Sequence, residues 1–588
     1  MRKLILLTWL LLASRVFFAQ EFVFDLMERR DLRLEQIEKL AEDHFKKVGT
    51  GQGTGNKQFQ RWLFEQKFHL DAKGFILPPE RDWEAYRENK AALLTMDAPG
   101  TWVEKGPTYW NRTSGWNPGV GRVTSVAVNP QDTAILFVSS PGGGIWKSTT
   151  GGNNWTPLVD HNASWMNVYN LCIDPNNPST IYAGLTSGGV IKSTNGGATW
   201  AATGSGPSSI KKVLVQPGNS NIVFATANNG IYRSTNGGTN WTQVQNTSKE
   251  DIEFKPGDVN TMYASGSTSN NSVWRSTDNG LTWTVLTSAQ GITNSGRTLL
   301  AVSANNPEVV YAVQASGSVF GRMYRSLNSG QSFETTVVGN ASQGTNFFGY
   351  ETNGTGTTGQ ATYDMAICAN PDNANEVHIA GIICWRSTNG GFNFSPTSAW
   401  SLPNSVGYNH ADVHALEWVN KTIYSGSDGG IYKRPSGATT WTELSNGLGI
   451  RQFYRMANSK TNPAIFQGGA QDNGTSFYRA NGTWVDWLGA DGMDCLISPL
   501  NESLIWGTSQ NGTFYRSTTQ GSSYSNLGKP SNGQWVTPLA IEANSNVIYG
   551  GWTGVYRSTD NGTTWTNLSS GVITTTLACL AVAPTNPQ

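Results

Sequence analysis

Short stretches of alternating apolar and polar residues fill the chain from about residue 105 onward, and turns rich in Gly, Asn and Asp separate them. Residues 124–158 show the repeating pattern, in which Val126 and Val128 alternate with small residues before an Asn-Pro turn and three further stretches. Alternation with a period of two predicts strands with one buried face. We therefore predict four short antiparallel strands in each segment of roughly 40 residues, which is typical of a β-propeller blade.

An octapeptide marks the turn between the third and fourth predicted strands of each repeat. It reads Ser-Thr-Asp-Asn-Gly-x-Thr-Trp at 276–283 and 558–565. Asp and Asn side chains bind nearby backbone N–H groups in tight turns, and Gly allows a positive φ. Weaker copies begin at Ser148, Ser193, Ser234, Ser326, Ser387 and Ser517. When the two intact copies are included, neighbouring copies are mostly 41 to 50 residues apart. We predict purely structural roles for the following octapeptide residues: Ser276, Asp278, Gly280, Trp283, Ser558, Asp560, Gly562 and Trp565.

An aromatic residue closes each repeat, and it should pack between neighbouring blades. Ten such residues occur: Trp155, Trp200, Trp241, Trp283, Phe333, Phe394, Trp441, Trp484, Tyr524 and Trp565. Residues 574–588 then repeat the first strand of a blade, because Leu580–Pro584 matches Val126–Pro130. These positions predict an all-β propeller, either as one ten-bladed ring that this strand closes or as a fragment whose later blades are missing.

The first hundred residues have a different pattern. Met1-Arg2-Lys3 and the apolar run Leu4–Leu12 predict a signal peptide over 1–19, too short to span a bilayer. Apolar residues at helical spacing over Asp25–Lys47, and again near 59–64 and 83–94, predict a helical N-terminal extension. The predicted domains are the signal peptide (1–19), the extension (20–100) and the propeller region. The resemblance described below divides that region into a first seven-bladed propeller (101–450) and the start of a second, incomplete one (451–588).

Composition places such a protein outside the cell. The 588 residues include 66 Gly and 23 Trp, only 14% are charged, and the formal net charge is zero. Bulk charge therefore attracts neither nucleic acid nor anionic membranes, and we predict a secreted or surface-exposed protein without a membrane span. Five cysteines are too few for a disulfide framework, although Cys368 and Cys384 lie in adjacent predicted strands and either form a bridge or remain buried thiols.

Candidate chemistry lies on the face opposite the octapeptide turns, where blade-to-blade connections emerge. Asp428 and Asp472 occupy equivalent turns between second and third predicted strands. Paired carboxylates suit glycoside hydrolysis, in which one donates a proton and the other activates water or attacks carbon. The structural alternative is an Asp that merely caps a Gly-rich turn. Other predicted ligand-binding residues lie in the connections entering the seventh and ninth repeats: His410, Asp412, His414, Trp487 and Asp491, with Asp494 beside them.

The His410-x-Asp412-x-His414 motif contains residue types that bind metals. On a strand these alternate residues are too extended to surround one ion, so we predict neither a metal nor a cofactor. The motif remains either a polar patch for sugar or peptide, or a set of structural histidines. Neighbouring aromatic and acidic residues are expected at Tyr350, Tyr408 and Tyr363-Asp364, and the insert Asn340–Gln360 is expected to form a flap.

These motifs resemble known families. The octapeptide turns are similar to the Asp-box repeats of sialidases, sortilins and two-propeller xyloglucanases. The longer motifs at 121–123, 142–148, 410–416, 427–432 and 468–474 resemble those of large secreted Bacteroidetes proteins described as glycosyl hydrolases or sortilin-N-terminal-like. The resemblance covers about 101–588 and favours two seven-bladed rings. It also implies that the Asp428 turn is similar to one carrying a catalytic Asp in xyloglucanases, although the turn at 140–143 has no acid.

Two functions follow from these observations. We predict that the loop face binds an extracellular polysaccharide or protein ligand. The alternative is a glycoside hydrolase acting on a β-glucan-like polysaccharide, with Asp428 and Asp472 as its acid and base. Sialidase activity is not expected, because most arginines precede octapeptide serines and belong to the repeat: Arg233, Arg275, Arg325, Arg386, Arg516 and Arg557.

Overall fold

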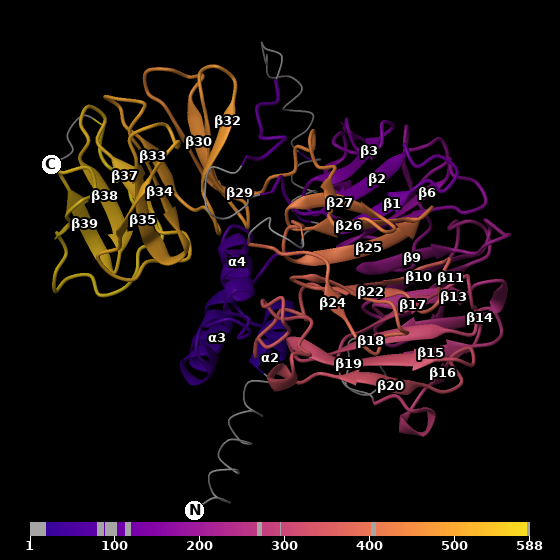
Figure 1. Cartoon of the computed structure of the whole chain (residues 1–588). Helices are drawn as coiled ribbons and strands as arrows, with labels where there is room; N and C mark the ends of the chain where they lie inside the picture. Colours follow the sequence, from indigo (N-terminus) through magenta and orange to yellow (C-terminus); the bar gives the residue numbers. More distant parts are fainter. Residues whose placement is uncertain are drawn as a thin grey trace, which may run out of the picture. The chain divides into compact units, whose positions relative to one another are not determined.

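A computed structural model of the chain describes residues 19–78, 81, 88, 103–111, 119–266, 273–293, 296–401 and 407–584 (Figure 1). The described residues separate into two compact units. Unit 1 comprises 1–103 and 122–445, and unit 2 comprises 104–121 and 446–588. The predicted signal peptide up to residue 18 and the predicted helix at 83–94 lie outside the described residues, apart from the single position 88.

Within the described part of the chain, ten four-stranded antiparallel sheets follow the three α-helices, each with its strands in chain order. This confirms the all-β prediction. In unit 1 the first four sheets are β1 Ser125–Val128, β2 Leu136–Ser140, β3 Gly144–Ser148, β4 Thr156–Pro157; β5 Val168–Ile173, β6 Ile181–Leu185, β7 Val190–Ser193, β8 Ala201–Ala202; β9 Ile210–Val215, β10 Val223–Ala227, β11 Gly230–Ser234, β12 Thr242–Gln245; and β13 Asp251–Lys255, β14 Asp258–Ser265, β15 Val273–Ser276, β16 Thr284–Val285.

Three further sheets complete unit 1, and three make up unit 2. Those of unit 1 are β17 Thr298–Val302, β18 Val310–Ser316, β19 Val319–Ser326, β20 Glu334–Val338; β21 Ala366–Ala369, β22 Val377–Ala380, β23 Cys384–Ser387, β24 Ser395–Pro396; and β25 Val413–Val419, β26 Thr422–Ser427, β27 Gly430–Pro435, β28 Thr442–Glu443. Those of unit 2 are β29 Phe453–Asn458, β30 Phe466–Ala470, β31 Gly474–Tyr478, β32 Trp484–Leu488; β33 Cys495–Ile497, β34 Ile505–Ser509, β35 Thr513–Ser517, β36 Ser525–Gly528; and β37 Leu539–Ile541, β38 Ile548–Trp552, β39 Gly554–Ser558, β40 Thr566–Asn567.

The first strands of successive sheets lie side by side. In unit 1 this order runs β1, β5, β9, β13, β17, β21 and β25, and β25 in turn lies beside β1. In unit 2, β33 lies between β29 and β37. Polar side chains near the starts of these strands accept backbone N–H bonds from the next sheet. Examples are Asn170 with Val213 at 2.9 Å and Asp251 with Leu300 at 2.8 Å.

The octapeptide turns have the predicted structural chemistry. Ser276 Oγ accepts the N–H of Gly280 at 3.0 Å, and Asp278 accepts both the N–H and the hydroxyl of Thr282 at 2.9 and 2.6 Å. Gly280 has φ +72°, and a Cβ there would lie 2.5 Å from the Phe224 ring of the preceding sheet. Glycine is therefore required by both the turn and the packing. In the last copy, bonds from the Thr564 hydroxyl and N–H lower the pKa of Asp560 to about 2.

Basic residues just before the octapeptides connect neighbouring sheets. Lys147 Nζ donates to the Gly196 carbonyl at 2.7 Å, Arg275 Nε to the Ser329 carbonyl at 2.8 Å, and an Arg233 amino group to the Asn279 side chain at 2.8 Å. Lys192, Arg479 and Arg516 make the equivalent bond to the octapeptide turn of the following sheet. These cations are therefore structural, which agrees with assigning the arginines to the repeat.

Each of the ten closing aromatic residues directly precedes or begins a fourth strand, as predicted. Most are buried or half-buried, and the Trp155 indole N–H donates to the Leu444 carbonyl between the first and seventh sheets at 2.8 Å. Tyr524 differs, since its side chain is 41% exposed. The repeat length therefore locates the sheets correctly, but not the burial of every closing ring.

The helical extension consists of α2 Ala19–Glu28, α3 Leu34–Val48 and α4 Asn56–Gln66 (Figure 1). The prediction of one helix over Asp25–Lys47 is wrong, because the chain turns at 29–33. Arg33 is extended there, and its N–H is capped by the Gln36 side chain at 3.0 Å. The break allows the three helices to enclose an apolar core of their own: Val23, Leu26, Leu34, Ile37, Ala41, Phe45, Phe59, Leu63 and Ile76.

Two other expectations differ from the structure. The predicted first strand at Leu580–Pro584 is absent from the described residues, where only Thr576 forms an isolated bridge, to Thr553. No further strand is described there for it to pair with. All five cysteines are free, so the possible Cys368–Cys384 bridge is not formed. Cys384 is buried, and burial raises the pKa of its thiol to about 12, which disfavours the reactive thiolate.

We expect the replacement Asp278→Ala to destabilise unit 1 by about 1–2 kcal/mol, since it removes the acceptor for three donors in a partly exposed turn. Chemical denaturation followed by tryptophan fluorescence measures this loss. The control is Asp160→Ala, at an exposed aspartate between the first and second sheets, which should change stability much less. Equal effects of the two replacements would contradict a structural role for the octapeptide acid.

Candidate functional site

Asp428 lies in the turn between β26 and β27, and its carboxylate is almost completely buried, at 2% exposure. One oxygen accepts Arg122 Nε at 2.9 Å and lies 2.8 Å from His414 Nε2. The other accepts the Tyr363 hydroxyl at 2.7 Å. A carboxylate can only accept, so His414 must carry its hydrogen on Nε2 in this pair.

None of these donors belongs to the turn that contains Asp428. Arg122 precedes β1, Tyr363 precedes β21, and His414 lies in β25, so the carboxylate connects the loop ends of three different sheets. The turn is satisfied separately, because the Gly429 N–H points to Ser427 Oγ at 3.4 Å. The alternative in which Asp428 merely caps its own Gly-rich turn therefore does not describe this geometry.

The rings around Asp428 are also packed together. The Arg122 guanidinium lies over the Tyr363 ring, 5.3 Å from its centre, which allows a cation–π contact. The Tyr363 and His414 rings meet edge to face, with centres 5.0 Å apart. Three donors of different chemistry are thus held in fixed orientations on the predicted ligand face.

The neighbouring motif residues lie beside Asp428. The Asp428 N–H donates to the Asp412 carbonyl at 3.2 Å, and Asp412 accepts Gln360 Nε2 at 2.8 Å. Asp412 has φ +64°, a left-handed conformation that is strained for most residues but tolerated by Asp and Asn. The His410 side chain is buried and packs against Gly429. A side chain at position 429 would place its Cβ only 2.2 Å from the His410 imidazole ring, so only glycine fits there. The motif is therefore kinked rather than fully extended.

Asp364 was expected only as an acidic neighbour of the site, but its surroundings in the structure are unusual. It precedes β21 and is fully buried, and neither carboxyl oxygen has a hydrogen-bond partner among the described residues. Burial, followed by the negative charge of Asp412, raises the pKa of Asp364 well above its usual value. The sequence placed this acid near the site, but burial of its side chain depends on the fold.

The insert Asn340–Gln360 does not form the expected flap. Its Phe347 and Phe348 are buried in the core of the sixth sheet, and Phe347 lies against the Trp385 ring with centres 4.9 Å apart. Gln360, at its end, donates to Asp412 and accepts Gln58 Nε2 of helix α4 at 3.1 Å. The insert is otherwise rich in Gly and Thr, which is typical of an exposed loop. Burial of Phe347 and Phe348 instead holds it against unit 1.

In unit 2, Asp472 is also in the left-handed region, with φ +56°. Its N–H donates to Asp491 at 3.1 Å, while Gln510 donates to the second Asp491 oxygen at 2.5 Å. Asp491 is fully buried, whereas Asp472 is partly exposed. The predicted ligand contact Asp491 therefore supports the backbone of Asp472. Since Asp428 and Asp472 belong to different units, their pairing stays a prediction.

Trp487 and Asp494 have structural surroundings. Trp487 is fully buried in the core of unit 2, among Phe477, Leu488, Ile497 and Ile505, where no ligand reaches its ring. Asp494 accepts the N–H groups of Cys495 and Leu539, at 2.9 and 3.0 Å, and so joins two neighbouring sheets. Its place near the start of the first strand matches that of Asp251 in unit 1.

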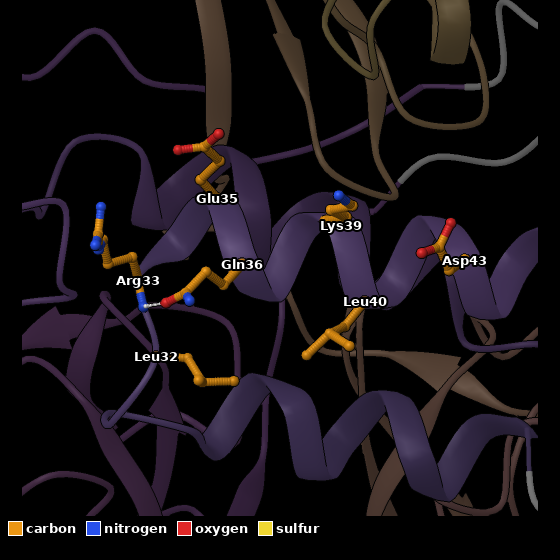
Figure 2. A pocket seen from close by; sticks show the side chains of 7 residues that line it. All are labelled: Leu32, Arg33, Glu35, Gln36, Lys39, Leu40 and Asp43. Carbon is orange, nitrogen blue, oxygen red and sulfur yellow. Dashed lines mark hydrogen bonds between the residues drawn. The ribbon is translucent and has the colours of Figure 1, made fainter.

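A surface hollow of about 480 Å³ lies on α3 of the helical extension (Figure 2). Its lining combines leucines with charged side chains of both signs: Leu32, Arg33, Glu35, Gln36, Lys39, Leu40 and Asp43. Figure 2 shows the bond from the Arg33 N–H to the Gln36 side chain among these residues. None of the residues predicted for ligand binding lines this hollow.

Comparisons with known proteins confirm the predicted resemblance to Asp-box propellers. A family model described as "Sortilin, neurotensin receptor 3" matches residues 228–390. A GH74 enzyme from Niastella koreensis has a similar fold, with a TM-score of 0.60 and 20% identity over 81% of this chain and 75% of that one. A GH74 xyloglucanase from Xanthomonas campestris gives a TM-score of 0.60 and 14% identity, covering 77% and 74%. None of the curated proteins matches this sequence. At these identities the likeness establishes the fold.

No helix in the described parts of the chain is long and apolar enough to cross a membrane.

We expect Asp364→Asn to change how stability depends on pH. Because the pKa of Asp364 is raised in the folded protein, the unfolded chain releases this proton at a lower pH than the folded protein does, so the group costs progressively more stability as pH rises above about 4. The thermal midpoint of the variant, relative to the unaltered protein, should therefore increase between pH 4.5 and pH 8 in buffer free of divalent cations. A difference that stays constant with pH would show that Asp364 is not held protonated.

Proposed function

We propose that this protein is a secreted or surface-exposed Asp-box propeller that binds an extracellular glycan through the loop face around Asp428. In this proposal unit 1 is a closed seven-bladed ring, which the contact of β25 with β1 supports. Unit 2 contributes the first three blades of a second ring. Two seven-bladed rings fit the sequence resemblance better than a single ring of ten blades.

The observation that carries the proposal is the arrangement of donors around Asp428. A buried carboxylate that only stabilised its turn would use the backbone N–H groups of that turn, whereas Asp428 orients a guanidinium, a phenol and an imidazole from three other segments. Oriented cationic and aromatic side chains of this kind bind sugar hydroxyls and the apolar faces of sugar rings. The GH74 xyloglucanase of similar fold supports a glycan over a protein ligand.

The second candidate function is hydrolysis of a β-glucan-like polysaccharide. Glycoside hydrolysis requires one ionised and one protonated carboxyl. The three donors to Asp428 stabilise its ionised form, which suits the base or nucleophile. Asp472 would then be the acid. Its strained backbone, held by Asp491, favours this role, because strain of this kind is concentrated at functional sites.

Binding is tested with the full chain by affinity electrophoresis against xyloglucan, mixed-linkage β-glucan and an unrelated α-glucan. Asp428→Asn should weaken β-glucan binding by about tenfold, since it disturbs the charge-assisted bonds that orient Arg122 and His414. The matched control Asp160→Asn, at an exposed aspartate, should bind as the unaltered protein does. Unchanged binding by Asp428→Asn would refute a glycan site at this carboxylate.

Hydrolysis is tested separately by measuring reducing ends released from the same polysaccharides. If the protein is an enzyme, Asp428→Asn and Asp472→Asn should each lower kcat by at least about a hundredfold. Asp472→Asn should leave the binding measured by electrophoresis nearly unchanged, because Asn tolerates the left-handed backbone. If the unaltered protein binds the polysaccharides but releases no reducing ends, hydrolysis is rejected and the binding function stands.

A further inference from the structure

The buried carboxyl of Asp364 is an unusual feature of unit 1. The side chain is 0% exposed, and neither oxygen has a hydrogen-bond partner in the described part of the chain. An unpaired carboxyl in such a place is costly unless it carries a proton or meets a cation. The sequence positions it immediately before β21, in the segment that also supplies Tyr363 to Asp428.

Asp412 belongs to the same small region. The Gly381 carbonyl accepts the Val413 N–H at 2.8 Å, directly after Asp412, and a Cβ built on Gly381 would lie 3.7 Å from the nearer Asp364 carboxyl oxygen. Asp412 is 6% exposed and is held by Gln360. Asp428 follows through its N–H bond to the Asp412 carbonyl. Three buried carboxyl groups thus gather where the chain enters the seventh sheet.

Positive charge near these acids is already engaged. Arg122 and His414 are bound to Asp428. Arg297 donates to the carbonyls of Ala361 and Tyr363, each at 3.3 Å, and lies 3.7 Å from Glu250. Among the described residues no cationic side chain is hydrogen-bonded to Asp364. Asp412 and Asp428 each act on the Asp364 carboxyl more strongly than the positive charge of Arg297 does, so the surroundings of that carboxyl favour a cation.

We propose that Asp364 and Asp412 bind a calcium ion in unit 1. Carboxylate oxygens are hard ligands, and Ca²⁺ accepts both oxygens of one carboxylate in an irregular shell of six to eight ligands. Two unpartnered oxygens on Asp364 suit such bidentate binding. Mg²⁺ requires a stricter octahedron and retains its waters, which a fully enclosed carboxyl does not accommodate. Among the described residues, no cysteine or imidazole is hydrogen-bonded to Asp364, so nothing beside this carboxyl favours zinc.

This site goes beyond glycan binding and can be tested without any glycan. It also differs from the sequence-based prediction of no metal, which considered only the His410-x-Asp412-x-His414 motif. Asp364 and Asp412 are 48 residues apart in the sequence, so they do not form a motif of closely spaced metal ligands. The ion would join the start of the sixth sheet to that of the seventh.

The test uses the full chain, treated with chelator, dialysed and titrated with CaCl₂ by calorimetry. The unaltered protein should show saturable binding of one ion and a thermal midpoint that rises with CaCl₂ concentration. Asp364→Asn and Asp412→Asn should each weaken binding at least about tenfold and abolish the rise in midpoint. Both variants should fold, since Asp364→Asn replaces a buried carboxyl that has no hydrogen-bond partner by a neutral group of the same size, and Asp412→Asn keeps a side chain that tolerates positive φ.

The matched control Asp160→Asn removes an exposed carboxylate from unit 1 and should bind Ca²⁺ as the unaltered protein does. MgCl₂ at the same concentrations should give a smaller shift of the midpoint. The proposal is overturned if the unaltered protein shows no saturable binding of Ca²⁺, which would mean that Asp364 holds only a proton. It is equally overturned if both aspartate variants bind Ca²⁺ with the original affinity.

Discussion

The fold depends on bonds that pass from each sheet to the next. A four-stranded sheet of about 20 residues buries too little surface to be stable alone, so every blade needs its neighbours. Here the dependence is chemically specific. A lysine or arginine before each of several Asp-box turns donates to the following turn, and a polar residue near the start of the first strand accepts an N–H from the following sheet. One set of bonds acts at the end of the third strand and the other near the start of the first strand.

This repetition explains why the fold could be predicted so well from the sequence. The Ser-x-Asp-x-Gly-x-Thr-Trp pattern combines a turn, a glycine that contacts the previous sheet and an aromatic ring, and all of these are local to eight residues. The break between α2 and α3 was missed because apolar spacing continues across 29–33, and only the Gln36 cap ends the continuity. The buried Phe347 and Phe348 were missed because their partners are distant in sequence.

The candidate site was predictable only in part, for a related reason. Asp428 stood out as an acid in a turn between second and third strands, and Asp412 and His414 stood out in the connection that enters the seventh repeat. The fold brings these three residues together. Arg122 and Tyr363 carry no such local signal as partners of Asp428, since their meeting requires contact between the first, sixth and seventh sheets. For Trp487 the sequence led to the reverse result. Its place in a predicted connection suggested a ligand contact, but the ring is buried in the core of unit 2.

Residues 104–121 belong to unit 2, although they precede most of unit 1 in the sequence. Tyr109 and Asn111 bond to the backbone of Trp484, and the buried Arg451–Asp486 ion pair of unit 2 also contacts the Gly119 carbonyl and the Asn111 N–H. The chain therefore passes between the units three times, near 103, 121 and 445, rather than once. Residues 122–445 of unit 1 are therefore inserted between the two parts of unit 2, 104–121 and 446–588. A fragment starting at residue 446 would lose partners of a buried charge, so the two units cannot be separated by a single cut.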